Sequence, residues 1–196
     1  MAFEDASRVP RASGVAPEPS LLLAAAGAQP GSLATALEDA KWDSLLESLP
    51  NAFYSQALHI GAFICTEAMR LADRCQRLLT FQLSVGFQDL DRNALKAAVC
   101  GVASGAGVSS RSTDLLIISD LLPADQPEVL ERLTALAARA LPSGGHCALL
   151  HWTDDSPCGT SGEAGAEAFV RLAQSRLLPL RRRRTPDFRL DILERV

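Results

Sequence analysis

The stretch from Thr113 to Trp152, TDLLIISDLLPADQPEVLERLTALAARALPSGGHCALLHW, decides the fold class. Its apolar run at 114–119 predicts a buried strand, because such runs are typical of the middle of a parallel sheet. Residues 127–141 repeat apolar side chains at helical spacing, a Pro-Ser-Gly-Gly turn follows, and 146–152 is another apolar run. A strand, a helix and a strand in this order predict a parallel sheet covered by helices.

The same alternation continues on both sides of this stretch. Upstream we expect a helix at 33–48 with Ser32 as its N-cap, then strand 57–60, helix 64–76, strand 78–83, a short helix at 87–96 and a weak strand at 97–102. Downstream we expect helix 161–177 and two closing strands, 178–184 and 188–195. The chain is therefore predicted to be an α/β protein with helices on both faces of a mostly parallel sheet.

Length and composition favour one globular domain. The chain has 196 residues, of which 47% are hydrophobic and 21% charged. Residues 1–19 lack any hydrophobic period and predict a flexible tail. The domain then covers 20–196, with N-terminal helices within 20–50 and the α/β core at 57–196.

Charge and cysteine content exclude several classes of protein. The net charge of −4 argues against a nucleic-acid-binding face, and aromatic residues, at 5%, are scarce for stacking on bases. None of the five cysteines forms a C-x-x-C pair, so we expect no metal site and a reduced, cytoplasmic protein. The apolar run at 21–28 is too short for a membrane span, and its flanks do not suit an export signal.

Three segments also carry a family resemblance. They are 114–120 (DLLIISD), 142–152 (PSGGHCALLHW) and 187–193 (DFRLDIL). In this order and at these distances they resemble the fourth, fifth and last strands of class I S-adenosylmethionine (SAM)-dependent methyltransferases, and more narrowly the NodS-like group from bacteria. The resemblance covers about residues 30–196. It implies a Rossmann-like three-layer sandwich with strand order 3-2-1-4-5-7-6 and an antiparallel C-terminal hairpin, 178–195, at the sheet edge.

The resemblance places the cofactor loop of the family at 59–65, HIGAFIC. Small residues in this loop let the backbone approach the cofactor, and the following helix N-terminus offers free N–H groups. Here Gly61 is retained, but His59 replaces the acidic residue of the first strand. Phe63 and Cys65 replace the small residues, and Gln82 replaces the acid that binds the ribose hydroxyls. A phenylalanine side chain at 63 would occupy the cofactor crevice itself.

Further departures concern the second half of the expected pocket. The stretch between the second and fourth strands is shorter than in the family, and its part at 101–112 is rich in Gly and Ser. The family has an Asp near the adenine in this stretch, but here no Asp occurs between Asp91 and Asp114. Ala166 stands where many members have a histidine. Two lost charge-assisted contacts would cost roughly 3–6 kcal/mol, or about two to four decades of affinity.

Three polar residues are candidate catalytic groups. Asp120 follows the strand at 114–119 and could act as a general base or contact a substrate. His59 and His151 fall near the ends of predicted parallel strands, where each could act as an acid–base group or the two could bind a metal; we expect instead that His59 fills a vacated pocket and that His151 is a family feature. Arg181–Arg184 is the only charge run, and it protects an edge strand or meets an acidic partner. A serine-hydrolase elbow and a phosphate-binding loop are both missing from the sequence.

These patterns lead to two hypotheses about function. In the first, the chain is a pseudo-methyltransferase that has no cofactor, does not bind SAM in the usual way, and acts as a homo- or hetero-oligomeric binding partner. In the second, it is an active SAM-dependent small-molecule methyltransferase or an enzyme with altered chemistry in the same pocket. We expect the first, with Asp120 and His151 as the residues that would carry any catalysis, and no nucleic-acid or membrane partner.

Overall fold

A single mixed sheet is the centre of the fold in the computed structural model, which describes residues 30–61, 66–82, 113–122, 124–158 and 162–196. Within these residues the strand order is β2-β1-β3-β4-β6-β5. The strands are β1 (Tyr54–Gly61), β2 (Cys75–Gln82), β3 (Leu115–Ser119), β4 (His146–Trp152), β5 (Leu177–Arg184) and β6 (Phe188–Arg195).

The sheet is parallel except at its C-terminal hairpin. Strands β2, β1, β3 and β4 pair in parallel, β6 pairs antiparallel with β4, and β5 pairs antiparallel with β6 at the edge. The predicted parallel pairing of 57–60 with 114–118 is confirmed, since Ala57 is in register with Leu115 and Ile60 with Ile118. The α/β fold class and the edge hairpin are confirmed as well.

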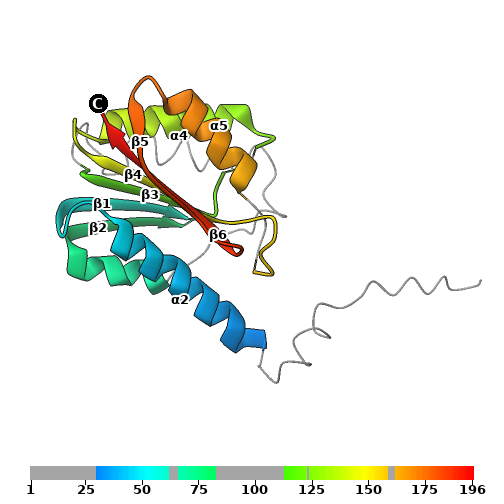
Figure 1. Cartoon of the computed structure of the whole chain (residues 1–196). Helices are drawn as coiled ribbons and strands as arrows, with labels where there is room; N and C mark the ends of the chain where they lie inside the picture. Colours follow the sequence, from blue (N-terminus) through cyan, green and yellow to red (C-terminus); the bar gives the residue numbers. More distant parts are fainter. Residues whose placement is uncertain (1–29, 62–65, 83–112, 123, 159–161) are drawn as a thin grey trace, which may run out of the picture. The chain divides into compact units, whose positions relative to one another are not determined.

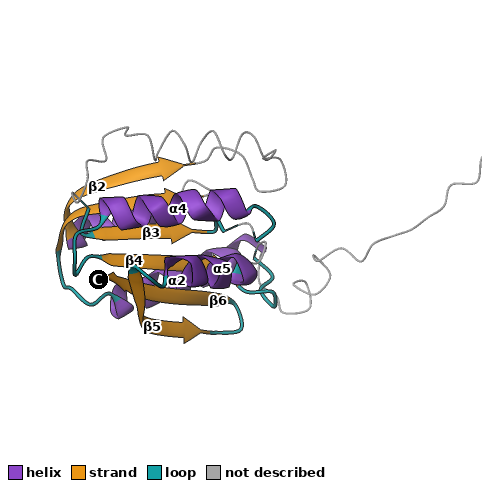
Figure 2. Ribbon diagram, turned by 90° about the horizontal axis from the view of Figure 1, so that it is seen from above, coloured by secondary structure: helices purple, strands orange, loops and turns teal. Residues whose placement is uncertain are grey.

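Helices cover both faces of the sheet, as Figures 1 and 2 show. They are α2 (Pro30–Ser48), the 3-10 helix η1 (Thr66–Arg74), α4 (Pro127–Ala140) and α5 (Glu163–Ala173). Residues 36–196 form one compact unit. Helices α4 and α5 pack on one face, and η1 with residues 36–48 of α2 packs on the other. None of the helices in the described ranges is long and apolar enough to cross a bilayer.

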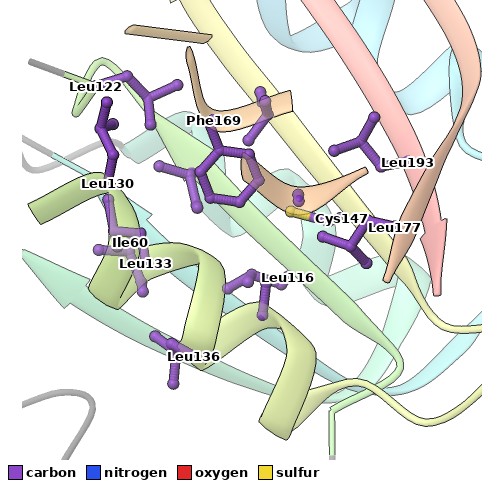
Figure 3. Packing of buried hydrophobic residues seen from close by; sticks show 14 of the residues in the cluster. Ile60, Leu116, Leu122, Leu130, Leu133, Leu136, Cys147, Phe169, Leu177 and Leu193 are labelled. Atoms are coloured by element: carbon purple, nitrogen blue, oxygen red, sulfur yellow. The ribbon is translucent and has the colours of Figure 1, made fainter. Parts of the chain in front are cut away.

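Alternate residues of the central strands supply two separate cores. Leu116 and Cys147 face α4 and α5, where Phe169 of α5 packs over them (Figure 3). Ile117 of β3 faces the opposite way and joins Trp42 of α2 in the second core. Because β3 is buried on both faces, all five of its residues are buried, as expected for a central parallel strand.

Two glycines occupy positions where a side chain would be strained or would clash. Gly144 lies in the turn before β4 with φ of +80°, a conformation that side chains disfavour. Gly165 lies in α5 where a Cβ would come 1.7 Å from the carbonyl oxygen of Leu122. Helix α5 therefore packs directly on the backbone that follows β3, near the end of the sheet where the candidate site lies.

Several predicted boundaries are wrong by a few residues. Strand β1 begins at Tyr54, which pairs with Cys75, so β2 begins earlier than predicted and the helix expected at 64–76 ends at Arg74. Helix α2 begins at Pro30, because proline suits a first turn, so Ser32 lies inside the helix and is not its N-cap. The segments expected at 1–19, 20–28, 87–96 and 97–102 lie outside the described residues.

Candidate functional site

The four parallel strands end at one edge of the sheet, and the candidate site lies there. Gly61, the last residue of β1, is in register with Gln82 of β2 and with Ser119 of β3. Ser119 is in turn in register with Leu150 of β4. Ligands of open α/β sheets bind outside this carboxyl edge. The structure therefore brings Gly61 and the backbone of Gln82 together where the sequence predicts a pocket.

His59 fills the space beside Gly61 on the α2 face of the sheet. Its Nε2 shares a hydrogen bond with Ser119 Oγ at 2.8 Å, and its ring meets Trp42 edge to face with 5.4 Å between centroids. A Cβ on Gly61 would lie 2.7 Å from Ser119 Oγ and 2.9 Å from His59 Nε2. Burial, reinforced by the charge of Lys41, lowers the pKa of His59 to about 4. The imidazole is therefore neutral at pH 7.

The Ser119–His59 pair has the spacing of a nucleophile and its base, but its surroundings favour a structural role. His59 Nδ1 is buried and has no hydrogen-bond partner within the described ranges, so no third group orients the ring. His59 is fully buried and Ser119 is 4% exposed. The two side chains fill the space at the ends of β1 and β3, beside Gly61.

Lys41 of α2 places a charge in the middle of this site. Its side chain is 0% exposed, and its Nζ lies 2.8 Å from Asp120 Oδ2 and 3.0 Å from Glu38 Oε2. The ammonium also lies 3.8 Å from the ring centroid of Trp152, and Trp42 Nε1 donates to Glu38 Oε1 at 2.9 Å. A buried ammonium requires such compensation, because desolvating an unpaired charge is very costly. Two carboxylates and an indole face thus bind one internal cation.

Asp120, the predicted acid–base residue, is the acidic partner of this cation. It follows β3 in a left-handed conformation with φ of 51°, and its N–H donates to the Leu150 carbonyl at 2.9 Å. Burial raises the pKa of the Asp120 carboxyl, while the charge and hydrogen bond of Lys41 oppose that rise. Its Oδ1 is buried and has no partner in the described part of the chain. Asp120 therefore lies at the predicted edge, engaged by Lys41.

His151 lies on the other face of the sheet, so it does not form a pair with His59. Its neighbours in alternation, Cys147 and Leu149, belong to the core beneath α4 and α5, and Gly162 lies against its Cβ. Burial, and secondly the charge of Arg189, lowers the pKa of His151 to about 4. Neither ring nitrogen has a hydrogen-bond partner in the described structure. The two histidines alternate to opposite faces, so they do not form a pair that could bind one metal ion, and the acid–base role of each stays a prediction.

The four consecutive arginines of β5 pair with residues of this same chain, on both faces of the sheet. Arg181 donates to the Ser48 carbonyl at the end of α2, and Arg183 lies 3.4 Å from Glu47. Arg182 pairs with Asp191 of β6, and Arg184 pairs with Glu163 of α5 at 2.8 Å. Each arginine therefore has an internal partner, which agrees with the edge-protecting role.

Some predicted cofactor residues lie outside the described structure, and the sequence analysis did not identify several residues of the site. Phe63 and Cys65 lie outside the described residues, as does the side chain of Gln82. The missed residues are Glu38, Lys41, Trp42, Ser119 and Trp152. One signal could have found them: Lys41 lies midway between Leu37 and Leu45 at four-residue spacing, so a charge interrupts the apolar stripe of the helix.

Solved structures with the same architecture include several methyltransferases. A methyltransferase candidate from Pseudomonas syringae matches with a TM-score of 0.53 and 23% identity, over 81% of this chain and 99% of that chain. The fold is that of the class I SAM-dependent methyltransferases. The N-methyltransferase NodS from Bradyrhizobium japonicum WM9 matches with a TM-score of 0.51 and 19% identity, over 83% and 96% of the two chains. No protein-family model and no curated protein matches the sequence.

A third methyltransferase of similar fold has been solved with a product of the cofactor bound. Geranyl diphosphate C-methyltransferase from Streptomyces coelicolor A3(2), solved with S-adenosylhomocysteine, matches with a TM-score of 0.55 and 13% identity, over 80% of this chain and 77% of that chain. Two described residues of the present chain bear on the fit of such a cofactor. A neutral His59 stands at the position of the acid in the first strand, and the Lys41 ammonium lies against Asp120.

Proposed function

We propose that this protein is a pseudo-methyltransferase, which keeps the methyltransferase fold, does not bind SAM in the usual mode, and acts by binding another protein chain. The observation that carries the proposal is the fully buried Lys41 ammonium bound to Asp120 at the carboxyl edge of the sheet. His59 and Ser119 support it, because their side chains occupy the space beside Gly61. A location in the cytoplasm is part of the same proposal.

A second candidate is an active enzyme in the same pocket, either a SAM-dependent small-molecule methyltransferase or one with altered chemistry. One observation favours it: Asp120 has a buried oxygen without a partner among the described residues, at the edge where ligands of this fold bind. Burial also raises the pKa of this carboxyl, which suits a general base. If Lys41 left the site, Asp120 would be positioned for such a role.

The proposed partner surface is the edge strand β5. Residues 36–48 of α2 bury Trp42 and Leu45 in the second core, so this segment is used inside the domain. On β5, by contrast, Leu178 and Leu180 are each 49% exposed. An edge strand with exposed leucines can pair with another chain, although the neighbouring arginines limit indiscriminate pairing. The partner that pairs with β5 is either a second copy of this chain or a different protein.

Calorimetry with SAM and with S-adenosylhomocysteine tests the proposal on the purified chain. We expect no saturable heat for either compound at micromolar concentration, because the site is engaged by its own side chains. The variant Phe63→Gly with Cys65→Gly and Gln82→Asp restores the residues that the resemblance implies. A gain in affinity indicates that only these residues block the pocket, and a folded variant without a gain indicates that the pocket is lost more widely. A micromolar dissociation constant of the unaltered chain for SAM would contradict the proposal and favour the enzyme hypothesis. Light scattering at micromolar concentration tests self-association separately.

A further inference from the structure

The surroundings of Lys41 have the features that recognise a primary ammonium. An ammonium group has three N–H donors and no acceptor. Here carboxylate oxygens of Asp120 and Glu38 lie 2.8 and 3.0 Å from Nζ, and the Trp152 ring lies 3.8 Å away on its face. Carboxylates combined with an aromatic face are a known solution for binding organic cations. The arrangement is therefore chemically selective for a cation.

The site has more acceptor capacity than Lys41 uses. Lys41 Nζ lies against carboxylates of Asp120 and Glu38, and Glu38 also accepts a hydrogen bond from Trp42 Nε1, so the spare acceptor is on Asp120. The adjacent His59 is neutral at pH 7, so it contributes no second positive charge. Asp120 Oδ1 is buried and makes no close hydrogen bond within the described ranges, although the backbone N–H of Trp152 acts on this carboxyl and lowers its pKa. A buried acceptor without a donor is costly, which favours any ligand that brings one.

The cation and its acceptors come from different parts of the fold. Asp120 and Trp152 lie at the ends of β3 and β4, whereas Lys41 enters from α2. We propose that Asp120 and Trp152 form a binding site for a small primary alkylammonium ligand, and that Lys41 is its built-in occupant and competitor. Binding exchanges one ammonium for another and involves no covalent step. This inference goes beyond the proposed function, and it does not depend on whether SAM binds.

The Lys41→Ala variant of the full chain tests the site directly. This substitution removes Cγ, Cδ, Cε and Nζ, so the vacated space has the shape of n-propylammonium. We expect n-propylammonium chloride to raise the thermal midpoint of the variant saturably, by on the order of a few degrees. The unaltered protein should not respond, because the tethered Lys41 acts at an effective concentration in the millimolar range or above.

Matched controls separate charge recognition from filling of a cavity. At equal concentration, 1-propanol should give less than about one third of the shift, because it lacks the charge that the carboxylates bind. Sodium chloride at the same ionic strength should give none. Lys41→Met fills the stem of the site and should not respond, and Lys41→Ala with Asp120→Asn should lose the response. An equal response to propanol and propylammonium, or a response that survives Asp120→Asn, overturns the proposal.

A second measurement needs no variant to fold. The chain has two lysines, Lys41 and Lys96, so acetylation of Lys41 by acetic anhydride can be followed on a single peptide by mass spectrometry. We expect native Lys41 to react at least about tenfold more slowly than in urea, because the amine is buried and ion-paired. Reaction as fast as in urea contradicts the proposal, because Lys41 would then not be held in the site. Neither assay contains SAM, so their outcome is independent of the cofactor test.

Discussion

The buried pair of Lys41 and Asp120 is predicted to be energetically coupled, and a double-mutant cycle measures that coupling. The two side chains lie 2.8 Å apart, with 0% and 13% of their surfaces exposed. Removing one partner of a buried ion pair leaves an uncompensated charge and typically costs about 3–5 kcal/mol. We therefore expect Lys41→Met and Asp120→Asn each to lower the free energy of unfolding by about 3 kcal/mol.

The double variant distinguishes pairing from local packing. Because Lys41→Met with Asp120→Asn removes both charges, its loss should fall short of the summed single losses by at least about 2 kcal/mol. Glu38 then retains its hydrogen bond from Trp42, so the second carboxylate is not left without a donor. Urea unfolding followed by tryptophan fluorescence and circular dichroism gives all four free energies.

An exposed ion pair is the matched control for this cycle. Arg70 pairs with Asp43 at 2.7 Å, but the two side chains are 37% and 60% exposed. Solvent-exposed pairs contribute about 1 kcal/mol or less, so Asp43→Asn should change stability little. Losses below about 1 kcal/mol for both single variants at the buried pair, or strict additivity in the double variant, would refute the reasoning.

Two other predictions concern stability. In the folded protein, burial lowers the pKa of His59 and of His151 from 6.5 to about 4, so between these pH values the unfolded chain binds more protons. The free energy of unfolding is therefore highest above pH 6.5, and each histidine lowers it by roughly 3 kcal/mol as the pH falls to 4. Urea unfolding at several pH values in this range should show the decrease. The variant His151→Gln should show a smaller decrease. Gly165→Ala forces a Cβ to within 1.7 Å of the Leu122 oxygen and should cost about 3 kcal/mol or more, whereas Gly144→Ala, with nothing within 4 Å, should cost about 1 kcal/mol. Equal losses for the two alanine variants in urea unfolding would contradict the packing argument.

The fold was predictable because its central elements carry strong local patterns. Strand β3 is apolar at Leu115, Leu116, Ile117 and Ile118, and both of its faces are indeed buried. The helix expected at 127–141 ends within one residue of α4, because the Pro-Ser-Gly-Gly turn defines its end. A start near Pro123 was also expected, and it is wrong, because α4 begins at Pro127. The boundaries of β1 and β2 were less predictable, because pairing between Tyr54 and Cys75 extends both strands beyond their apolar runs.

The site was predictable in position but not in composition. Gly61 and Asp120 lie at the predicted sheet edge, because parallel strands bring their carboxyl ends together. The partner of Asp120 lies 79 residues away on α2, and no local pattern joins the two. His151 was grouped with His59 by its place near a strand end. Strand alternation, however, puts the two rings on opposite faces, and the pairing register needed to see this comes from the structure.

A crystal of the unaltered protein soaked with S-adenosylhomocysteine tests the central claim most directly. The claim is that side chains of this chain occupy the site at the carboxyl edge of the sheet. We predict that Lys41 Nζ remains within hydrogen-bond distance of Asp120, and that no ligand density appears over Gly61. Full density for the ligand over Gly61, with Lys41 displaced from Asp120, would contradict it.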